Sequence, residues 1–390
     1  MKKVMLAYSG GLDTSCCVKW LQDKGFEVIC FSANLGSEFS PDQIKKKARQ
    51  SGVAKVYVKD LRKEFAQEYI LPALKANAVY ESKYVLSTAL GRPLIAKYLV
   101  DIAHQEKADY VAHGCTGKGN DQVRIDTTVK ILDPKLKIIA PVREWELTSR
   151  ESEIAYAKKH RIQISTTKEK IYSIDQNIWG ISIEGGMMED LANAPDENAY
   201  ILTKNIDNTP NKAEIIEIEF NQGIPIKING NKKDFLGIIN VLNKIGAKHC
   251  IGRTDLIEDR TVGIKSREVY EAPAAWLLLK AHQELESVVL DKDTINFKNI
   301  VALKYAQLVY QGLWFARLRR SLDAFVSLTQ EKVTGMIKLK LYKGNITVTA
   351  RKSKHSLYKK ELATYSEADQ FAREDAKGFI EIFSLPYREI

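Results

Sequence analysis

The strongest chemical signal in the sequence is the segment SGGLDTS at residues 9–15. Two adjacent glycines let a ligand approach the backbone closely, and the Ser and Thr hydroxyls lie beside the unpaired N–H groups of an expected helix start. Such a cradle binds anions, above all nucleotide phosphates. A Walker A loop needs GxxxxGK[ST], and the nearest match, around Gly117 and Lys118, lacks the first glycine and the final hydroxyl residue. A tight turn without a ligand would not explain the hydroxyls clustered next to Asp13.

A second polar segment, HGCTGKGNDQVR at residues 113–124, follows an expected strand. Ligands of an open parallel sheet bind beyond the carboxyl ends of its strands, so this segment should face the same crevice. Its Thr, Asn and Gln side chains supply hydrogen bonds, and Arg124 suits bidentate capture of a carboxylate. The set fits a small zwitterion, with a plain surface loop as the alternative. His113 ends an apolar strand, where a structural role is the simpler interpretation, and we assign it no chemistry.

The elements that must position these segments follow a βαβα rhythm in the first part of the chain, which predicts a parallel sheet wrapped by helices. We expect strands at 4–8, 26–34, 54–58 and 110–113, and helices at 14–24 and 94–106. A further helix should begin with Ser40 as its N-cap and Pro41 as its first residue, and end at Gly52.

Beyond residue 166 the pattern changes to an α+β arrangement. A strand at 214–220 and a hairpin at 336–350 predict antiparallel pairing, with long helical patterns at 272–290 and 300–326 between them. The fold class is therefore α/β, with a nucleotide-binding domain at 1–166, an α+β domain at 167–362 and an amphipathic C-terminal segment at 363–390.

Composition excludes several classes of protein. No stretch reaches the ~18 apolar residues of a membrane span, and the N-terminus lacks a secretory pattern, so we expect a cytoplasmic protein. The five cysteines form no CxxC pair, which argues against a disulfide or zinc framework. The net charge is +10, and residues 331–360 hold nine Lys or Arg against one Glu. We interpret these as the solvated face of the hairpin; nucleic acid is the less favoured partner, because no RRM, KH or zinc-knuckle pattern accompanies them.

Five blocks of the sequence, in order and in register, resemble the argininosuccinate synthase family: residues 7–15, 88–97, 113–124, 172–180 and 262–273. The similarity continues to residues 378–381 and so covers nearly the whole chain. The first block is similar to the P-loop of ATP pyrophosphatases, which cut ATP between its α and β phosphates. The resemblance implies an arginine-biosynthetic ligase that joins L-citrulline to L-aspartate, using ATP with Mg²⁺ and releasing AMP and pyrophosphate. It also implies that the second domain is a synthetase domain and that the C-terminal segment helps to assemble a homotetramer.

The resemblance assigns roles by position. ATP would be bound by Ala7, Tyr8, Ser9, Gly10, Gly11, Leu12, Asp13, Thr14, Ser15, Ala33 and Gly114. Citrulline would contact Tyr84, Thr88, Asn120, Arg124, Ser173, Ser182, Glu258 and Tyr270. Aspartate would be held by Thr116, Asn120 and Asp121. Asp121 is also the candidate to orient or deprotonate the aspartate amine, and Asp13 the candidate for the phosphate or Mg²⁺ site, although no metal ligand is identified.

The implied chemistry needs no enzyme nucleophile. The ureido oxygen of citrulline attacks the α-phosphate to give a citrullyl-adenylate, and AMP then leaves when the aspartate amine attacks. Alignment of bound reactants can supply about 7–11 kcal/mol of such a barrier. One rival is a P-loop pyrophosphatase that acts on tRNA, such as a thiolase or a lysidine synthetase; the thiolases commonly use the paired cysteines that this chain lacks. A second rival is a nucleotide-binding regulator without turnover, which the complete polar set beside the loop argues against.

Overall fold

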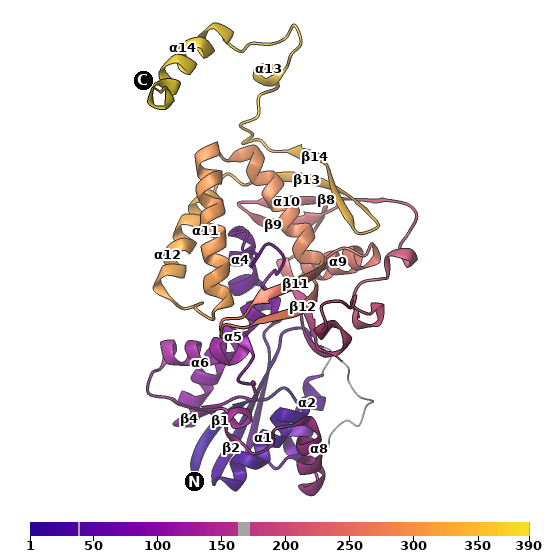
Figure 1. Ribbon diagram of the computed structural model, residues 1–390, viewed down its shortest axis with the longest axis vertical. Helices are drawn as coiled ribbons and strands as arrows, with labels where there is room; N and C mark the ends of the chain where they lie inside the picture. Colours follow the sequence, from indigo (N-terminus) through magenta and orange to yellow (C-terminus); the bar gives the residue numbers. More distant parts are fainter. Residues whose placement is uncertain (38–39, 163–171, 390) are drawn as a thin grey trace.

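The computed structural model describes residues 1–37, 40–162 and 172–389 (Figure 1). Its N-terminal part is built on a five-stranded sheet in the order β3-β2-β1-β4-β5, in which every neighbouring pair is parallel. The strands are β1 (Lys2–Ala7), β2 (Phe26–Asn34), β3 (Lys55–Asp60), β4 (Tyr110–Ala112) and β5 (Lys137–Ile139). The predicted parallel sheet is thus confirmed.

Helices cover both faces of this sheet, which explains why its central strand is continuously apolar. In β1, Val4 and Leu6 join the core formed with α1, α7 and α8, whereas Met5 faces the core formed with α5. The helical elements are α1 (Leu12–Asp23), α2 (Pro41–Gln50), α3 (Arg62–Glu64), the π-helix η1 (Phe65–Ile70), α4 (Leu71–Lys75), α5 (Ser87–Glu106), α6 (Asn120–Leu132), α7 (Pro141–Glu144) and α8 (Arg150–Lys159).

Two helix starts show where local signals succeed and fail. The start of α2 is as predicted, because the Ser40 side chain accepts a hydrogen bond from the backbone of Gln43. The start expected at residue 94 is wrong: α5 begins at Ser87 and runs through Pro93. Its first turn is held by Tyr84, whose hydroxyl oxygen accepts hydrogen bonds from the N–H groups of residues 88 and 89. This cap spans only 4 and 5 positions, but a tyrosine is not a usual N-cap residue, so the sequence does not mark it.

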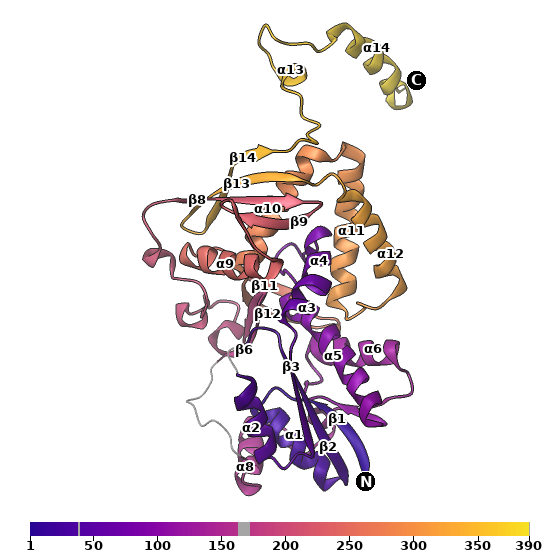
Figure 2. The ribbon, with the colours of Figure 1, turned by 180° about the vertical axis from the view of Figure 1, so that it is seen from behind.

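The C-terminal part contains two antiparallel sheets (Figures 1 and 2). The first, in the order β11-β12-β7-β6, consists of β6 (Ser173–Asn177), β7 (Gly180–Glu184), β11 (Arg253–Asp259) and β12 (Lys265–Glu271). The second, in the order β10-β9-β8-β13-β14, consists of β8 (Glu214–Asn221), β9 (Ile224–Ile228), β10 (Asn231–Lys232), β13 (Gly335–Tyr342) and β14 (Asn345–Lys352). Leu339 and Leu341 of the predicted hairpin are buried while Lys340 is exposed, which confirms its solvated basic face. The domain boundary expected at 166/167 lies outside the described residues.

Helices pack against these sheets and against α5. They are α9 (Phe235–Lys248), α10 (Pro273–Val289), α11 (Lys292–Tyr310) and α12 (Arg317–Thr329), accompanied by the short 3-10 turns η2 (Gly186–Glu189), η3 (Glu197–Ala199) and η4 (Ile206–Asn208). The helical pattern expected at 300–326 is divided into α11 and α12, because Gly312 adopts a φ of +76° and the chain turns there.

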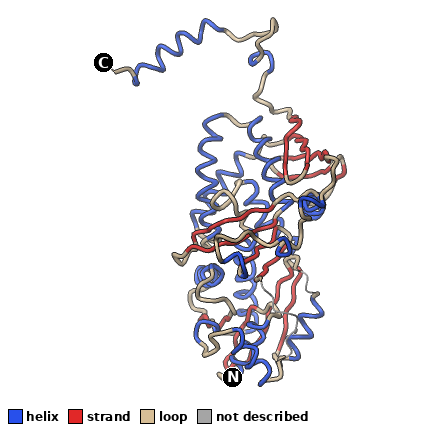
Figure 3. The backbone as a smooth tube through the Cα atoms, turned by 45° about the vertical axis from the view of Figure 1, so that its right-hand side comes forward, coloured by secondary structure: helices blue, strands red, loops and turns tan. Residues whose placement is uncertain are grey.

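The end of the chain forms an arm that stands clear of the body (Figures 1, 2 and 3). It comprises α13 (Lys360–Ala363), α14 (Arg373–Ser384) and η5 (Leu385–Tyr387). No residue of α14 is buried, and Phe379, Ile380 and Phe383 each expose more than half of their surface. Among the described helices, none combines the length and the apolarity needed to cross a membrane.

Candidate functional site

The loop between β1 and α1 carries the residues predicted to form a phosphate cradle. Gly10 has a φ of +76°, and Gly11 is the N-cap of α1 without any side-chain cap, so the first N–H groups of the helix are available to an anion. Ser9 Oγ lies 3.1 Å from Thr14 Oγ1 and accepts a hydrogen bond from Gly11 N. Tyr8 reaches the same helix through its hydroxyl, 3.2 Å from Ser15 Oγ. Hydroxyls and backbone donors therefore surround one point beyond the end of β1.

The loop after β4 meets this cradle. A Cβ added to Gly114 would lie 3.1 Å from Thr14 Cγ2, so the two loops are in contact, as expected from adjacent parallel strands. His113 supports the second loop: its Nε2 is 2.7 Å from Asp126 Oδ1, and its Nδ1 accepts a hydrogen bond from Cys115 N. With 1% of its surface exposed, His113 has the structural contacts predicted for it.

Two carboxyl groups meet at the start of α1. The Glu153 side chain, from α8, is half-buried and hydrogen-bonded to Asp13, and burial followed by this contact raises the pKa of Glu153 to about 8. Two carboxylates this close repel each other unless a proton or a cation lies between them. Oxygen donors of this kind are the ligands that Mg²⁺ prefers.

Helix α6 begins at Asn120 and presents the expected amino-acid-binding residues on its first turn. Asp121 forms ion pairs with Arg124 Nη1, at 2.9 Å, and with Arg92 Nη2, at 2.7 Å. Burial raises the pKa of Asp121, but the two guanidinium groups outweigh burial and lower it below its usual range. Asp121 is therefore held as a carboxylate, an arrangement better suited to orienting a cationic amine than to removing its proton.

Strands β11 and β12 carry the other half of the polar pocket to this helix. Glu258, 1% exposed, accepts hydrogen bonds from Asn120 Nδ2 (3.2 Å), Tyr310 OH (2.7 Å) and Tyr270 OH. The backbone N–H of Thr261, in the turn after β11, donates to Asn120 Oδ1 at 2.8 Å. The pocket thus joins the two halves of the chain through direct hydrogen bonds.

A second carboxyl group, Glu268 on β12, lies 3.0 Å from Tyr270 OH. Burial, then the nearby Glu258 and Glu184, raise the pKa of Glu268 to about 8. Arg260 binds both Glu184, at 2.6 Å, and Glu268, at 3.1 Å. Because the Tyr270 hydroxyl has one proton to donate, a protonated Glu268 completes the chain by donating to the Tyr270 oxygen.

Of the remaining residues predicted to bind substrates, some lie together with the buried polar residues and others lie at their edge. Thr88 Oγ1 is 3.2 Å from Ser182 Oγ, and the ring of Tyr84 stacks on Tyr270 with centroids 4.3 Å apart. Ser173 is exposed at the start of β6, opposite Glu184 in the register of β7. Ala33 is half-buried near the end of β2, and Thr116 is exposed in the loop after β4. The structure therefore brings together most of the citrulline set, while Ser173 and Thr116 border it without a side-chain hydrogen bond to the described residues.

Sequence reasoning missed Tyr310, Arg260 and Glu268. Tyr310 is the last residue of α11, and its hydroxyl contacts both Asn120 and Glu258. A tyrosine at the end of a helical pattern carries no local signal of such a role. For Arg260 and Glu268, the signal available was their position just before and within the block at 262–273.

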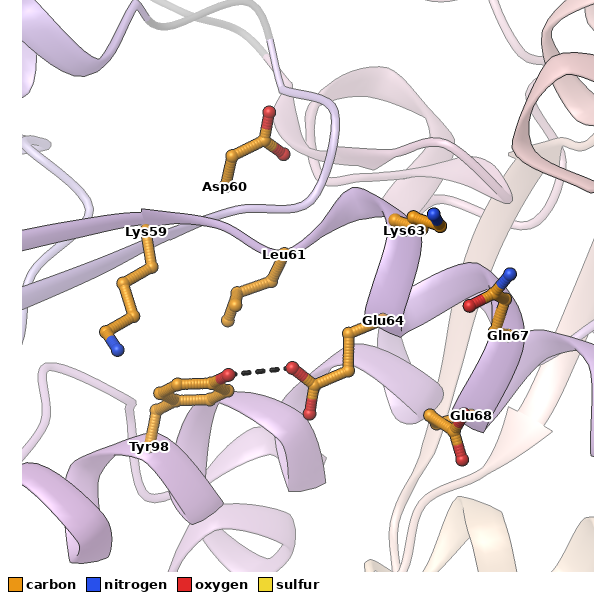
Figure 4. A pocket seen from close by; sticks show the side chains of 8 residues that line it. All are labelled: Lys59, Asp60, Leu61, Lys63, Glu64, Gln67, Glu68 and Tyr98. Carbon is orange, nitrogen blue, oxygen red and sulfur yellow. Dashed lines mark hydrogen bonds between the residues drawn. The ribbon is translucent and has the colours of Figure 1, made fainter. Parts of the chain in front are cut away.

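A hollow of about 590 Å³ lies apart from these residues, beside the end of β3 (Figure 4). Its lining includes Lys59, Glu64 and Tyr98, and the Tyr98 hydroxyl donates to Glu64 Oε2 at 2.7 Å. None of the residues assigned to ATP, citrulline or aspartate lines it.

Comparison with known proteins identifies relatives along almost the entire chain. The model for the arginosuccinate synthase N-terminal HUP domain matches residues 3–163, and the model for the arginosuccinate synthase C-terminal domain matches residues 172–390. An argininosuccinate synthase of Chlorobium luteolum is 53% identical over 385 residues, which are 98% of this chain and 96% of that protein. One of Carboxydothermus hydrogenoformans is 51% identical over 388 residues, with coverage of 99% and 97%.

Similar solved structures cover a smaller part of the chain. A predicted subunit of tRNA methyltransferase from Methanocaldococcus jannaschii is 14% identical, with a TM-score of 0.30, over 41% of this chain and 76% of that one. A 4-thiouridine synthetase–RNA complex with bound ATP is 16% identical, with a TM-score of 0.30, over 41% of this chain and 40% of that one. A TM-score of 0.30 is too low for either similarity to support a function.

Proposed function

The chain belongs to the argininosuccinate synthase family, and we infer that it is a ligase that joins L-citrulline to L-aspartate in arginine biosynthesis with ATP as the energy source. The single observation that carries this inference beyond the family match is the direct junction of two sites. The phosphate cradle after β1 touches the loop after β4, and that loop leads into the buried polar pocket of Asn120, Glu258 and Tyr270. A nucleotide and two amino acids would therefore meet within one crevice.

We propose that each substrate has its own part of this crevice. ATP lies along the β1–α1 loop, with Ala33 and Gly114 beside it. Citrulline lies among the residues of α5, α6, β7, β11 and β12, with Ser173 at its border. Aspartate is held by Thr116, Asn120 and Asp121, where the carboxylate of Asp121 faces the aspartate ammonium. The division into domains at 1–166, 167–362 and 363–390 forms part of the same proposal.

Mg²⁺ would be held at the cradle by Asp13, with Glu153 beside it. The raised pKa of Glu153 fits this proposal, since a cation between the two carboxyl groups would relieve the repulsion that favours the proton. When bound, the ion neutralises charge on the departing pyrophosphate. The N–H groups at the start of α1 and the hydroxyls of Ser9 and Thr14 bind the phosphates and align the α-phosphate with citrulline.

The reaction then proceeds by alignment of the bound substrates. The ureido oxygen attacks the α-phosphate and pyrophosphate leaves; the aspartate amine attacks the ureido carbon and AMP leaves. Among the residues placed at this site, Cys115 has a pKa that burial raises to about 12. Its thiol is thus protonated and poorly nucleophilic at neutral pH, which agrees with a mechanism without a covalent enzyme intermediate.

The test is pyrophosphate release from ATP and Mg²⁺ with citrulline alone, with aspartate alone, and with both. Sustained release that requires both amino acids supports the proposal. Release that needs neither, or ATP binding with no release in any mixture, contradicts it. A transfer RNA added to a fourth reaction tests the alternative substrate that the basic charge suggests.

We also propose that the chain forms a homotetramer in the cytoplasm, in which the arm of one copy covers apolar surface of another. The exposed apolar side chains of α14 support a protein partner for the arm, and α11 exposes Phe297, Ile300 and Leu303. A chain ending at residue 362 should sediment as a smaller assembly than the full chain. If the truncated chain contains the same number of subunits per assembly as the full chain, this role of the arm is contradicted.

A further inference from the structure

One tyrosine connects the two halves of the amino-acid pocket. Tyr310, the last residue of α11, is 1% exposed and contacts residues of both α6 and β11. Its hydroxyl accepts a hydrogen bond from Asn120 Nδ2 at 2.9 Å and donates one to Glu258 Oε1 at 2.7 Å. Its carbonyl oxygen accepts a hydrogen bond from Arg124 Nε at 2.8 Å. Three of the residues assigned to citrulline therefore share one neighbour.

The ring of Tyr310 is held from several directions. It stacks on Tyr80 with centroids 3.7 Å apart and packs edge-on against Tyr84 at 6.2 Å. The guanidinium carbon of Arg124 lies 4.9 Å from the ring centroid. In the turn that follows, a Cβ added to Gly312 would lie 2.5 Å from Arg124 Cα, so the end of α11 is docked closely on α6. The hydroxyl is thus presented from a rigid anchor.

This hydroxyl, together with Glu258 and the Thr261 N–H, holds the amide of Asn120 in one orientation. A carboxylate oxygen of Glu258 and the hydroxyl oxygen of Tyr310 both need a donor, and Nδ2 donates to both from one side of the amide. The opposite atom, Oδ1, then faces the N–H of Thr261. A flipped amide would place Oδ1 against the Glu258 carboxylate, which is repulsive. Without the hydroxyl, Asn120 loses one acceptor and Glu258 loses one donor.

We propose that Tyr310 is a positioning residue that fixes the orientation of Asn120 and thereby sets the affinity for both amino-acid substrates. This inference rests on the proposed function, because Asn120 is the residue that the citrulline and aspartate sites share. Tyr310 lies on α11, beyond the reach of the P-loop contacts, so ATP binding should not depend on its hydroxyl.

The test compares Tyr310→Phe with Tyr305→Phe. Both residues are buried on α11, but the Tyr305 hydroxyl donates to Asp323 and has no hydrogen bond to the pocket. Loss of hydrogen bonds to a buried charged group predicts that Tyr310→Phe raises KM for citrulline and for aspartate about tenfold each, with kcat changed little. The Kd of ATP, measured by calorimetry, should not change. Tyr305→Phe should leave all three values unchanged.

A double-mutant cycle distinguishes positioning from general support of the fold. In an Asn120→Ala background, Tyr310→Phe should raise the aspartate KM no further, because the residue through which it acts is absent. Unchanged KM values in Tyr310→Phe overturn the inference, and so does a full additive increase in the Asn120→Ala background. A wild-type chain with no citrulline- and aspartate-dependent pyrophosphate release overturns the proposed function itself, which is a separate result.

Discussion

Replacing Glu268 by Gln should make the protein more stable at alkaline pH. Glu268 has its pKa raised to about 8 by burial and by the neighbouring carboxylates. Between the unfolded value, near 4.5, and about 8, the folded protein binds a proton that the unfolded chain does not. The free energy of unfolding therefore falls as pH rises through this window and levels off above it. A glutamine cannot titrate, and its amide can donate to the Tyr270 oxygen as the protonated carboxyl does.

The size of the effect has an upper bound. A pKa moved from 4.5 to about 8 corresponds to at most ~5 kcal/mol of lost stability. Glu268 interacts strongly with its neighbouring carboxyl groups, which makes this value an upper limit, and we expect a difference of roughly 2 kcal/mol. This difference should be present at pH 9 and small at pH 4.5.

The assay is urea unfolding of the ligand-free protein at pH 4.5 and pH 9, with the variant compared with the wild type at each pH. Glu284→Gln is the matched control, because it should change the free energy of unfolding in the opposite direction. Burial raises the pKa of Glu284, but hydrogen bonds from Lys280 and Arg351 outweigh burial and lower it. Glu284 therefore stabilises the fold above its unfolded pKa, and its removal should lower stability at pH 9. A Glu268→Gln variant that is less stable at pH 9, or whose difference from wild type does not depend on pH, would refute the reasoning.

Three further substitutions and one control, Gly230→Ala, test the placement of the amino-acid site. Gly312→Ala should cost roughly 3 kcal/mol or more of unfolding free energy, because it combines a φ of +76° with a Cβ 2.5 Å from Arg124 Cα. Gly230→Ala is the control: its φ is the same and nothing lies within 4 Å of its added Cβ, so it should cost about 1 kcal/mol. Arg124→Lys should raise the citrulline KM by an order of magnitude or more, since the lysine cannot reproduce the guanidinium fork, and an unchanged KM would remove Arg124 from the site. Asp121→Asn should lower kcat and raise the aspartate KM, and near-normal values of both would exclude the orienting role.

Features that depend on local chemistry could be predicted from the sequence. The bounds expected for β2 agree with the structure, and α2 starts where Ser40 and Pro41 predict. Glycines in the β1–α1 loop and the hydroxyls around it predict a phosphate cradle, and the structure leaves the start of α1 without a side-chain cap there. The alternation of Leu and Lys in β13 predicted which face is buried, because the period of two is a property of the strand itself.

Features that depend on contacts between distant segments could not be predicted. The link from Tyr310 to Asn120 spans 190 positions, and the link from Glu258 to Asn120 spans 138. No periodicity or motif records which helix end will meet which strand, so the pocket's buried network appears only in three dimensions.

The hydrogen bonds already made in this network limit which substrate groups each side chain can bind. Asn120 Nδ2 donates to Glu258 and to Tyr310, which lie on one side of the nitrogen because they are hydrogen-bonded to each other at 2.7 Å, and Oδ1 accepts one bond from Thr261, so the amide keeps both a donor and an acceptor position. Arg124 uses Nε for a carbonyl and Nη1 for Asp121, and a guanidinium has five donors, so it still has donors left. Asn120 can thus accept from a substrate N–H group and donate to a substrate oxygen, whereas Arg124 offers donors alone and suits a substrate carboxylate. The proposed sharing of Asn120 by citrulline and aspartate fits this amide, because both substrates carry nitrogen donors that its oxygen can accept.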